Sequence, residues 1–294
     1  MGVVLDNGVL EAEVKMPEEA AGSRFDRTGW IACIRLKGRR RHEFGVPESF
    51  APGRGTGGSG LCAEFGISGP NGYDDAGVGE GFPKIGVGLL TRQGVRDYSF
   101  FEDYPVVPYQ VVTETGIDRI TFTVLPADCG GYAFRLTKSI ALRDARIHIE
   151  YMLENTGSRT LESDEYVHNF LAVNRQPAGP GYVLRFPVPV VFSEVESDYT
   201  TELLSAAGNE VLWNAVPERE FYARLPGWPA SMPWNWELIH LPSGAGVRES
   251  GDFAVAACAL WGKRHVISPE IFISLHIPPG QTGRWSRTYE FFEI

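Results

Sequence analysis

The sequence predicts a single all-β domain over residues 1–294, built from stacked, mainly antiparallel sheets. Apolar and polar residues alternate with a period of two in segments distributed along the whole chain, which is typical of half-buried strands. Turn-forming residues follow at short intervals. No segment shows the sustained i, i+3, i+4, i+7 apolar stripe of an amphipathic helix. These three observations favour a β-sandwich architecture.

The strand predictions depend on local patterns. Residues 30–36 (Trp-Ile-Ala-Cys-Ile-Arg-Leu) are apolar and partly β-branched. Residues 119–124 (Arg-Ile-Thr-Phe-Thr-Val) and 146–151 (Arg-Ile-His-Ile-Glu-Tyr) alternate strictly, so each should bury one face. Turns predicted at 116–118 and 155–157 contain glycine with aspartate or asparagine, the residues that tight turns favour.

Composition and charge limit the classes of partner. With 43% hydrophobic and 12% aromatic residues, the chain has enough apolar material for a large core. Its net charge of -10 is spread along the sequence and would repel phosphate backbones and anionic lipids. We therefore expect neither a nucleic acid nor a membrane as partner.

Cysteine usage and the N-terminal segment indicate the compartment. The cysteines are far apart and show no C-x-x-C spacing, so we expect free thiols and a reducing environment. Residues 1–20 contain charged residues throughout and no apolar signal core, and no apolar stretch is long enough for a membrane helix. The expected location is the cytoplasm.

Two glycine-rich segments interrupt the strand pattern. Residues 51–60 have almost nothing to pack and predict a mobile loop, with a role as a lid left open. Residues 66–88 lack the strand-then-helix context of a dinucleotide-binding loop. Their glycines predict a backbone packed close to a ligand or a neighbouring strand.

The sequence contains no G-x-S-x-G, P-loop or H-E-x-x-H motif, and no grouping of histidines or cysteines at metal-ligand spacing. We therefore expect no metal. One histidine differs from the others, because His168 lies between aromatic residues in 165–171, directly after the polar stretch 162–164. Its surroundings alone leave open a hydrogen-bonded structural histidine or a catalyst.

A carboxylate interrupts an otherwise apolar strand near the C-terminus. Glu270 lies in Ile-Ser-Pro-Glu-Ile-Phe-Ile-Ser-Leu, residues 267–275. A carboxylate in such surroundings must be paired, hydrogen-bonded or raised in pKa, and each of these prepares it to act as a general base. The alternative is that Glu270 points to solvent from an edge strand.

Several segments, taken together and in order, resemble bacterial aldose-1-epimerase-like proteins of the galactose-mutarotase-like superfamily. These segments are 22–31, 81–88, 167–170, 268–270, 279–282 and 285–291. The resemblance covers nearly the whole chain and implies a β-supersandwich of stacked sheets. It also implies that the ligand is a sugar.

The same resemblance implies the catalytic roles. His168 corresponds to the histidine that protonates the ring oxygen of the sugar, and Glu270 to the glutamate that removes the anomeric proton. Opening a cyclic hemiacetal needs both transfers, so an acid and a base on opposite sides of the ring suffice. No metal or organic cofactor is implied.

Residues that hold the substrate are predicted on weaker grounds. Where family members often have a histidine or arginine in the glycine-rich segment, this chain offers Lys84. Arg24 and Asp26 alternate on one predicted strand face and either bind sugar hydroxyls or form an ion pair. Glu64 needs a partner, for which Lys84 or Arg24 is suitable. Lys84 with Arg24 would also suit a phosphorylated or uronate sugar.

A tryptophan-rich segment, residues 228–237, is a further candidate for the sugar site. Aromatic faces bind the C–H side of a sugar ring while polar neighbours bind its hydroxyls. Trp236 and Glu237 are the residues expected to approach the site, and Asn169 is expected there as the neighbour of His168. Core packing of the tryptophans is the alternative.

The leading hypothesis from the sequence is an isomerase of carbohydrate metabolism, an aldose 1-epimerase that interconverts sugar anomers. Two alternatives stay open: a non-catalytic sugar-binding or sensing protein, and a polysaccharide lyase or glycoside hydrolase on the same scaffold. They are distinguished by whether His168 and Glu270 face one cavity with the width of a sugar ring between them. The particular sugar and the oligomeric state are not predicted.

Overall fold

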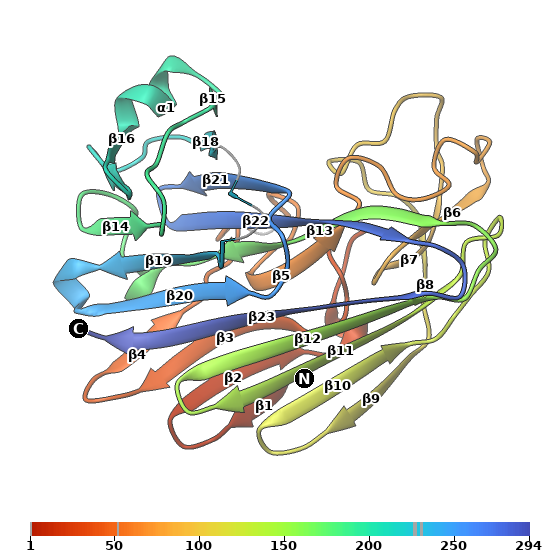
Figure 1. Ribbon diagram of the computed structural model, residues 1–294, viewed down its shortest axis with the longest axis horizontal. Coiled ribbons are helices and arrows are strands. Elements are labelled where there is room, and N and C mark those ends of the chain that lie inside the picture. The colour runs from red at the N-terminus through yellow and green to blue at the C-terminus, as the bar shows by residue number, and fades with distance from the viewer. Residues whose placement is uncertain (1, 52, 226–227, 230–231) are drawn as a thin grey trace.

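The computed structural model describes residues 2–51, 53–225, 228–229 and 232–294, and within these ranges the chain is built almost wholly from strands (Figure 1). Every strand pairing in these ranges is antiparallel. The all-β, stacked-sheet class predicted from the sequence is confirmed.

The described residues form a first large sheet that draws strands from both ends of the chain. Its strands, in spatial order, are β1 (Val3–Asp6), β2 (Leu10–Lys15), β3 (Trp30–Lys37), β5 (Gly60–Phe65), β13 (Leu161–Phe170), β22 (Val266–Ile277), β21 (Ala257–Lys263), β18 (Phe221–Leu225) and β15 (Glu194–Val195), with β4 (Arg41–Phe44) beside β3. Segments about a hundred residues apart in the sequence are therefore adjacent strands at its centre.

The second large sheet packs against the first. Its strands, in spatial order over the described residues, are β16 (Leu204–Ala207), β17 (Glu210–Trp213), β14 (Tyr182–Arg185), β19 (Asn235–His240), β20 (Ala245–Gly251), β23 (Thr282–Glu293), β12 (Arg146–Asn155), β11 (Phe134–Arg143), β10 (Arg119–Val124) and β9 (Val111–Thr115).

Smaller elements complete the described part of the chain. A third sheet contains β6 (Gly81–Lys84), β7 (Gly88–Thr91) and β8 (Val106–Pro108), and lies to one side of the two large sheets (Figure 1). Helical structure is limited to α1 (Asp198–Leu203) and to 3₁₀ turns at Pro17–Glu19, Val173–Arg175 and Leu241–Ser243.

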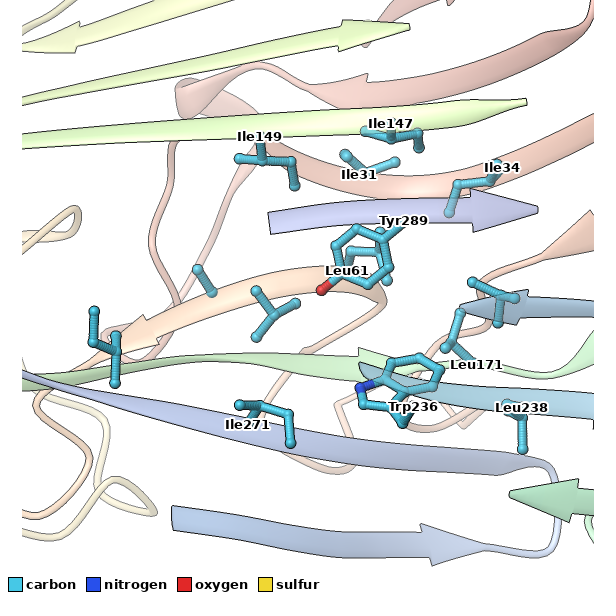
Figure 2. Packing of buried hydrophobic residues seen from close by; sticks show 14 of the residues in the cluster. Ile31, Ile34, Leu61, Ile147, Ile149, Leu171, Trp236, Leu238, Ile271 and Tyr289 are labelled. Atoms are coloured by element: carbon cyan, nitrogen blue, oxygen red, sulfur yellow. The ribbon is translucent and has the colours of Figure 1, made fainter. Parts of the chain in front are cut away.

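The hydrophobic core lies between the two large sheets. Figure 2 shows Ile31 of the first sheet close to Ile147 of the second, and Leu61 of the first sheet close to Tyr289 of the second. All of these side chains are fully buried or nearly so. Because side chains alternate along a strand, the other face of each large sheet points away from this core.

The predicted alternation is confirmed in the strands that carry the core. In β10, Ile120, Phe122 and Val124 are fully buried while the residues between them are not. In β12, Ile147 and Ile149 follow the same rule. The two-residue period of side chains along a strand therefore determines which side chains reach the core and which reach the outer faces.

Candidate active site

Two central strands of the first sheet, β13 and β22, lose their main-chain pairing over part of their length. The pairing ends at Glu165 opposite Ile273, and a single bridge beyond the gap joins Leu171 to Ile267. The register is the same on both sides of the gap. The residues in between therefore face each other across an opened ladder.

His168 and Glu270 lie opposite each other in this gap. Pro269 has no N–H to donate to β13. Its carbonyl accepts a hydrogen bond from Asn169 Nδ2 at 2.6 Å, and the Asn169 N–H donates to Ser268 Oγ at 2.9 Å. Side-chain atoms thus replace the missing ladder bonds. β22 is also a central strand, so the alternative of an edge-strand Glu270 does not hold.

Ser268 joins the two candidate catalytic groups. Its Oγ lies 2.9 Å from His168 Nδ1 and within hydrogen-bond distance of Glu270 Oε1, at 3.0 Å. His168 Nδ1 and Glu270 Oε1 are themselves 3.3 Å apart. Within the described residues, neither His168 Nε2 nor Glu270 Oε2 has a hydrogen-bond partner. One polar atom of each group is therefore free to meet a ligand.

Both side chains line a cavity of about 480 Å³ on the outer face of the first sheet. This volume falls in the range of small-molecule sites. Its lining combines aromatic rings with acids and bases from β13, β18, β21, β22 and the loops that cover them: Arg24, Glu48, Gly55, Thr56, Ile67, Phe100, Phe101, Tyr166, His168, Glu196, Glu220, Tyr222, Trp261, Lys263 and Glu270.

Aromatic rings fix the orientation of His168. Its imidazole stacks on Phe170 with ring centroids 4.0 Å apart and meets the edge of Trp261 at 4.9 Å. Phe25 approaches it edge-on from the covering loop at 6.1 Å. These contacts leave the ring little rotational freedom, so the direction of both ring nitrogens is set before a ligand arrives.

Burial changes the acidity of both groups. Burial, together with the positive charges of Arg24 and Lys263, lowers the pKa of His168 well below 6.5. Burial also raises the pKa of Glu270 to about 8, and the Ser268 hydrogen bond and Arg24 only partly oppose this rise. Each group is therefore pushed toward its uncharged form, the expected effect of a low-dielectric site.

A buried ionic cluster lies beside the pair. Glu64 binds Arg24 Nε at 2.8 Å and Lys84 Nζ at 3.1 Å, and accepts from Tyr166 OH at 2.7 Å. Burial alone would raise the pKa of Glu64, but Lys84 and Arg24 hold it below its ordinary value. Both partners foreseen for Glu64 are thus present.

Each guanidinium nitrogen of Arg24 donates one hydrogen bond to a protein oxygen, beginning with Nε to Glu64. Its other guanidinium nitrogens donate to Thr56 Oγ1 at 2.8 Å and to Tyr166 OH at 3.0 Å. Lys84 is fully buried, bonded to Glu64 and to Tyr98 OH, and does not belong to the described lining of the cavity. The lysine expected to contact the substrate instead stabilises a buried carboxylate.

The prediction that Arg24 and Asp26 share a strand face is wrong, because both lie in the loop before β3. Asp26 is fully buried and binds Lys138 Nζ at 3.2 Å together with Thr28 Oγ1 at 2.7 Å. It lies outside the described cavity lining, whereas Arg24 belongs to it. The two residues form separate ion pairs.

Asn169 points away from the cavity. It follows His168 in β13, so the period-two rule turns its side chain toward the second sheet. There it donates to Glu249 Oε2 at 3.3 Å and accepts from Tyr289 OH at 3.1 Å. Its interactions connect the two sheets behind the site.

The tryptophan-rich segment contributes to the core and not to the cavity. Trp236 is fully buried, as Figure 2 shows, and donates to Glu249 Oε2 at 2.7 Å. Glu237, on the other face of β19, pairs with Arg248 and Arg185. Residues 230–231 of this segment lie outside the described residues. The core-packing alternative is therefore the correct one for Trp236.

The glycine-rich loop reaches the cavity through Thr56. The Thr56 N–H and Oγ1 both donate to Glu48 Oε2, at 2.6 and 2.9 Å. Gly55 has a positive φ, and a Cβ there would lie 2.5 Å from the Glu48 carboxyl carbon, so this position requires glycine. The loop thus forms part of the wall, while residue 52 lies outside the described residues and the role of a lid stays a prediction.

No protein-family model and no curated protein matches the sequence. Solved structures match over almost the full length of the chain. The Slr1438 protein from Synechocystis sp. PCC 6803 matches with a TM-score of 0.64 at 13% identity, covering 100% of this chain and 96% of that one.

Two further matches carry more informative names. A galactose mutarotase-like protein from Lactobacillus casei ATCC 334 has a TM-score of 0.61 at 11% identity, with 99% and 100% of the two chains covered. A galactose mutarotase related enzyme from Lactobacillus acidophilus has a TM-score of 0.60 at 11% identity, with 100% and 98% covered. The chain has the galactose mutarotase-like fold. The resemblance noted from the sequence is confirmed at this level.

In this mutarotase-like fold, the predicted residues separate into two groups. His168, Glu270 and Arg24 line one cavity, and Glu64 with Lys84 lies beneath it. Asp26, Asn169, Trp236 and Glu237 lie elsewhere. The catalytic and substrate-binding roles themselves stay predictions.

Several residues in the cavity lining or directly behind it were missed in the sequence, although the two-residue period of a strand could have found some of them. Tyr166 precedes His168 by two residues and Ser268 precedes Glu270 by two, so each shares a strand face with its partner. Trp261 and Lys263 alternate in the same way in β21. What the sequence does not show is that β21 lies beside β22.

Within the described residues, no group of three or more histidine, cysteine, aspartate or glutamate side chains is arranged to hold a metal ion. All four cysteines are unpaired, as predicted. A search of the described residues finds no helix long and apolar enough to cross a membrane.

Proposed function

We propose that the protein is an aldose 1-epimerase, an isomerase that interconverts the anomers of a free aldose by acid–base catalysis. The observation that carries the proposal is the pair of His168 and Glu270, which are in contact and each present one unpartnered polar atom on the same cavity. The mutarotase-like fold supports the proposal but does not by itself assign an activity.

The contact between the pair corrects the expectation of a sugar ring's width between acid and base. The two oxygens that exchange protons, the anomeric hydroxyl and the ring oxygen, are bonded to the same carbon of the sugar. They therefore lie close together on one edge of the ring. Two neighbouring protein groups that approach this edge of the ring can reach both oxygens. The contact between His168 and Glu270 is therefore compatible with the reaction.

The protonation state of the pair also suits the reaction. Since the pKa of Glu270 is raised to about 8 and that of His168 is lowered, a neutral solution leaves a carboxylic acid beside an uncharged imidazole. The pair then provides one proton donor and one acceptor, as ring opening requires. Closure needs the same two groups with their roles exchanged, so no further reagent is consumed.

The remaining lining supports an uncharged aldose as substrate. Trp261 and Tyr222 provide aromatic faces for the C–H side of a sugar ring. Each guanidinium nitrogen of Arg24 already donates to a protein oxygen, and Lys263 lies between Glu220 at 3.2 Å and Glu48 at 3.8 Å. The positive charge of each cation is therefore already paired with a neighbouring carboxylate.

The proposal is tested by exchange NMR of anomer interconversion on a panel of free and phosphorylated aldoses. We expect at least one free aldose to interconvert well above its spontaneous rate. His168→Gln and Glu270→Gln should each reduce this acceleration by about 10²–10⁴-fold, the usual contribution of a general acid or base.

The chain contains a matched control for these variants. Glu162 of β13 and His276 of β22 form an exposed hydrogen-bonded pair at 3.2 Å on the same two strands. Glu162→Gln and His276→Gln should leave the rate unchanged. Sugar-dependent shifts of protein resonances without acceleration of any aldose would instead identify a sugar-binding protein and contradict the isomerase.

A further inference from the structure

The hydrogen bonds around Ser268 restrict where its proton can lie. A serine hydroxyl has one donor and two acceptor positions. One acceptor position is filled by the Asn169 N–H at 2.9 Å. The second acceptor position and the single donor must therefore serve His168 Nδ1 at 2.9 Å and Glu270 Oε1 at 3.0 Å. When Ser268 donates to one of them, the other must donate to Ser268.

This constraint links the protonation of Glu270 to the tautomer of His168. With Glu270 protonated on Oε1, the carboxyl donates to Ser268, Ser268 donates to Nδ1, and a neutral His168 carries its proton on Nε2. With Glu270 ionised, Ser268 donates to the carboxylate and His168 must carry its proton on Nδ1. The direct separation of Nδ1 and Oε1 is 3.3 Å, but the geometry of that contact does not make a hydrogen bond.

We propose that Ser268 is a positioning residue that relays a proton from Glu270 to His168 during ring opening, so that neither group becomes charged. This inference rests on the proposed aldose 1-epimerase activity. Ser268 is fully buried and touches no substrate, so it acts only through its two neighbours.

The proton transfers balance around a closed path. The anomeric O–H gives its proton to Glu270 Oε2, and its bonding electrons form the carbonyl of the open-chain aldose. The bond between the anomeric carbon and the ring oxygen breaks, and its electron pair stays on the ring oxygen, which takes the Nε2 proton of His168. The Oε1 proton of Glu270 moves to Ser268 Oγ, whose own proton moves to His168 Nδ1. Reversal after rotation about the carbonyl carbon closes the other anomer.

The surroundings favour a path without charge separation. Both groups are about 95% buried, since each retains 5% of its exposed surface. Arg24 and Lys263 disfavour an imidazolium, and Glu64 disfavours a second carboxylate. Tyr166 on the same face of the sheet and Cys258 on the opposite face interact electrostatically with the same carboxyl, but burial raises the pKa of each, so both are neutral across the working range. A relay avoids the cost of creating a charge in this environment.

The relay has a test that needs no turnover. ¹⁵N NMR of His168, with ¹³C detection of Glu270, should show the Nε2–H tautomer below about pH 8 and the Nδ1–H tautomer above it in the sugar-free wild type. The low pKa of His168 keeps its ring neutral throughout this range. In Ser268→Ala the tautomer should no longer follow the titration of Glu270. A wild-type tautomer that does not change while Glu270 ionises would overturn the relay.

Kinetics provides the second measurement. Ser268→Ala should lower kcat for anomer interconversion by about 10²-fold with little change in KM. Ser274→Ala, an exposed serine on the same strand, is the control and should match the wild type. A folded Ser268→Ala variant with kcat within about twofold of wild type would also overturn the relay. A tautomer change in a protein that accelerates no aldose would instead contradict the isomerase alone.

Discussion

At the scale of single residues, the site contains two titratable groups whose pKa values are shifted in opposite directions. His168 and Glu270 have near-equal burial, and the same desolvation lowers the pKa of the imidazole and raises that of the carboxyl. The neutral pair is therefore the stable form over the range between the two shifted values. A pair of this kind is typical of acid–base catalysis.

The pH dependence of the rate follows from these shifts. Above about pH 8, Glu270 loses its proton and the pair has no donor, so kcat/KM should fall by about tenfold per pH unit. On the acidic side, the rate should persist below pH 6.5, because His168 becomes protonated only well below its ordinary pKa. The measurement is kcat/KM from pH 4 to 10. An acidic limb centred near 6.5 would contradict a buried His168.

The buried carboxylate of Glu64 leads to a stability prediction. Glu64→Gln would leave Arg24 and Lys84 without their shared counter-ion, although all three side chains are about nine-tenths or more buried. Removing one partner of a buried ion pair costs about 3–5 kcal/mol. Urea denaturation should show this loss of unfolding free energy. Glu162→Gln, on the surface, should change it by less than about 0.5 kcal/mol.

At the scale of elements, the site results from an interruption in one strand pair. Pro269 prevents a continuous ladder between β13 and β22, and the gap holds His168 and Glu270 face to face. The sequence shows both residues and the proline. It does not show that residue 168 lies opposite residue 270, because register between strands about a hundred residues apart depends on the packing of the whole sheet.

The alternation of side chains along β13 explains why the expected position of Asn169 in the sugar site was wrong. A substitution at this residue tests the explanation. Asn169→Ala removes hydrogen bonds to Pro269, Glu249 and Tyr289 and leaves buried polar atoms unpaired. We expect a loss of about 1–3 kcal/mol in unfolding free energy, measured by denaturant titration. KM should change little, because the side chain faces the second sheet. A large rise in KM with unchanged stability would restore Asn169 to the substrate site.

At the scale of the whole molecule, the two sheets have separate functions. Between them, Arg287 binds Glu165 of β13 at 2.7 Å and Glu249 of β20 at 2.8 Å, and all three side chains are fully buried. This network holds the first sheet firmly from behind, while the opposite face of that sheet carries the cavity. Trp236 could not be assigned from the sequence, because an alternating pattern shows two faces without showing which one meets the other sheet.

The acidic character of the whole chain extends into the cavity and determines which sugars it should accept. Glu48, Glu196 and Glu220 line it, while Arg24 and Lys263 are engaged by carboxylates. The carboxylates repel a phosphate that approaches them, and this repulsion is stronger at low ionic strength. For whichever free aldose the protein accelerates, we expect kcat/KM for the phosphorylated form of that sugar to be at least about tenfold lower.

This discrimination should depend on the local carboxylates and not on net charge. The double variant Glu196→Gln with Glu220→Gln releases Lys263 from its closer partner, so it should reduce the preference for the free aldose over its phosphorylated form. Glu150→Gln with Glu162→Gln changes the net charge equally on exposed positions away from the cavity and should leave the preference intact. The measurement is the ratio of the two kcat/KM values at low and high salt. If the phosphorylated aldose reacts as fast as the free aldose in the wild type, the uncharged-substrate assignment fails, because the cavity carboxylates would then not repel the phosphate.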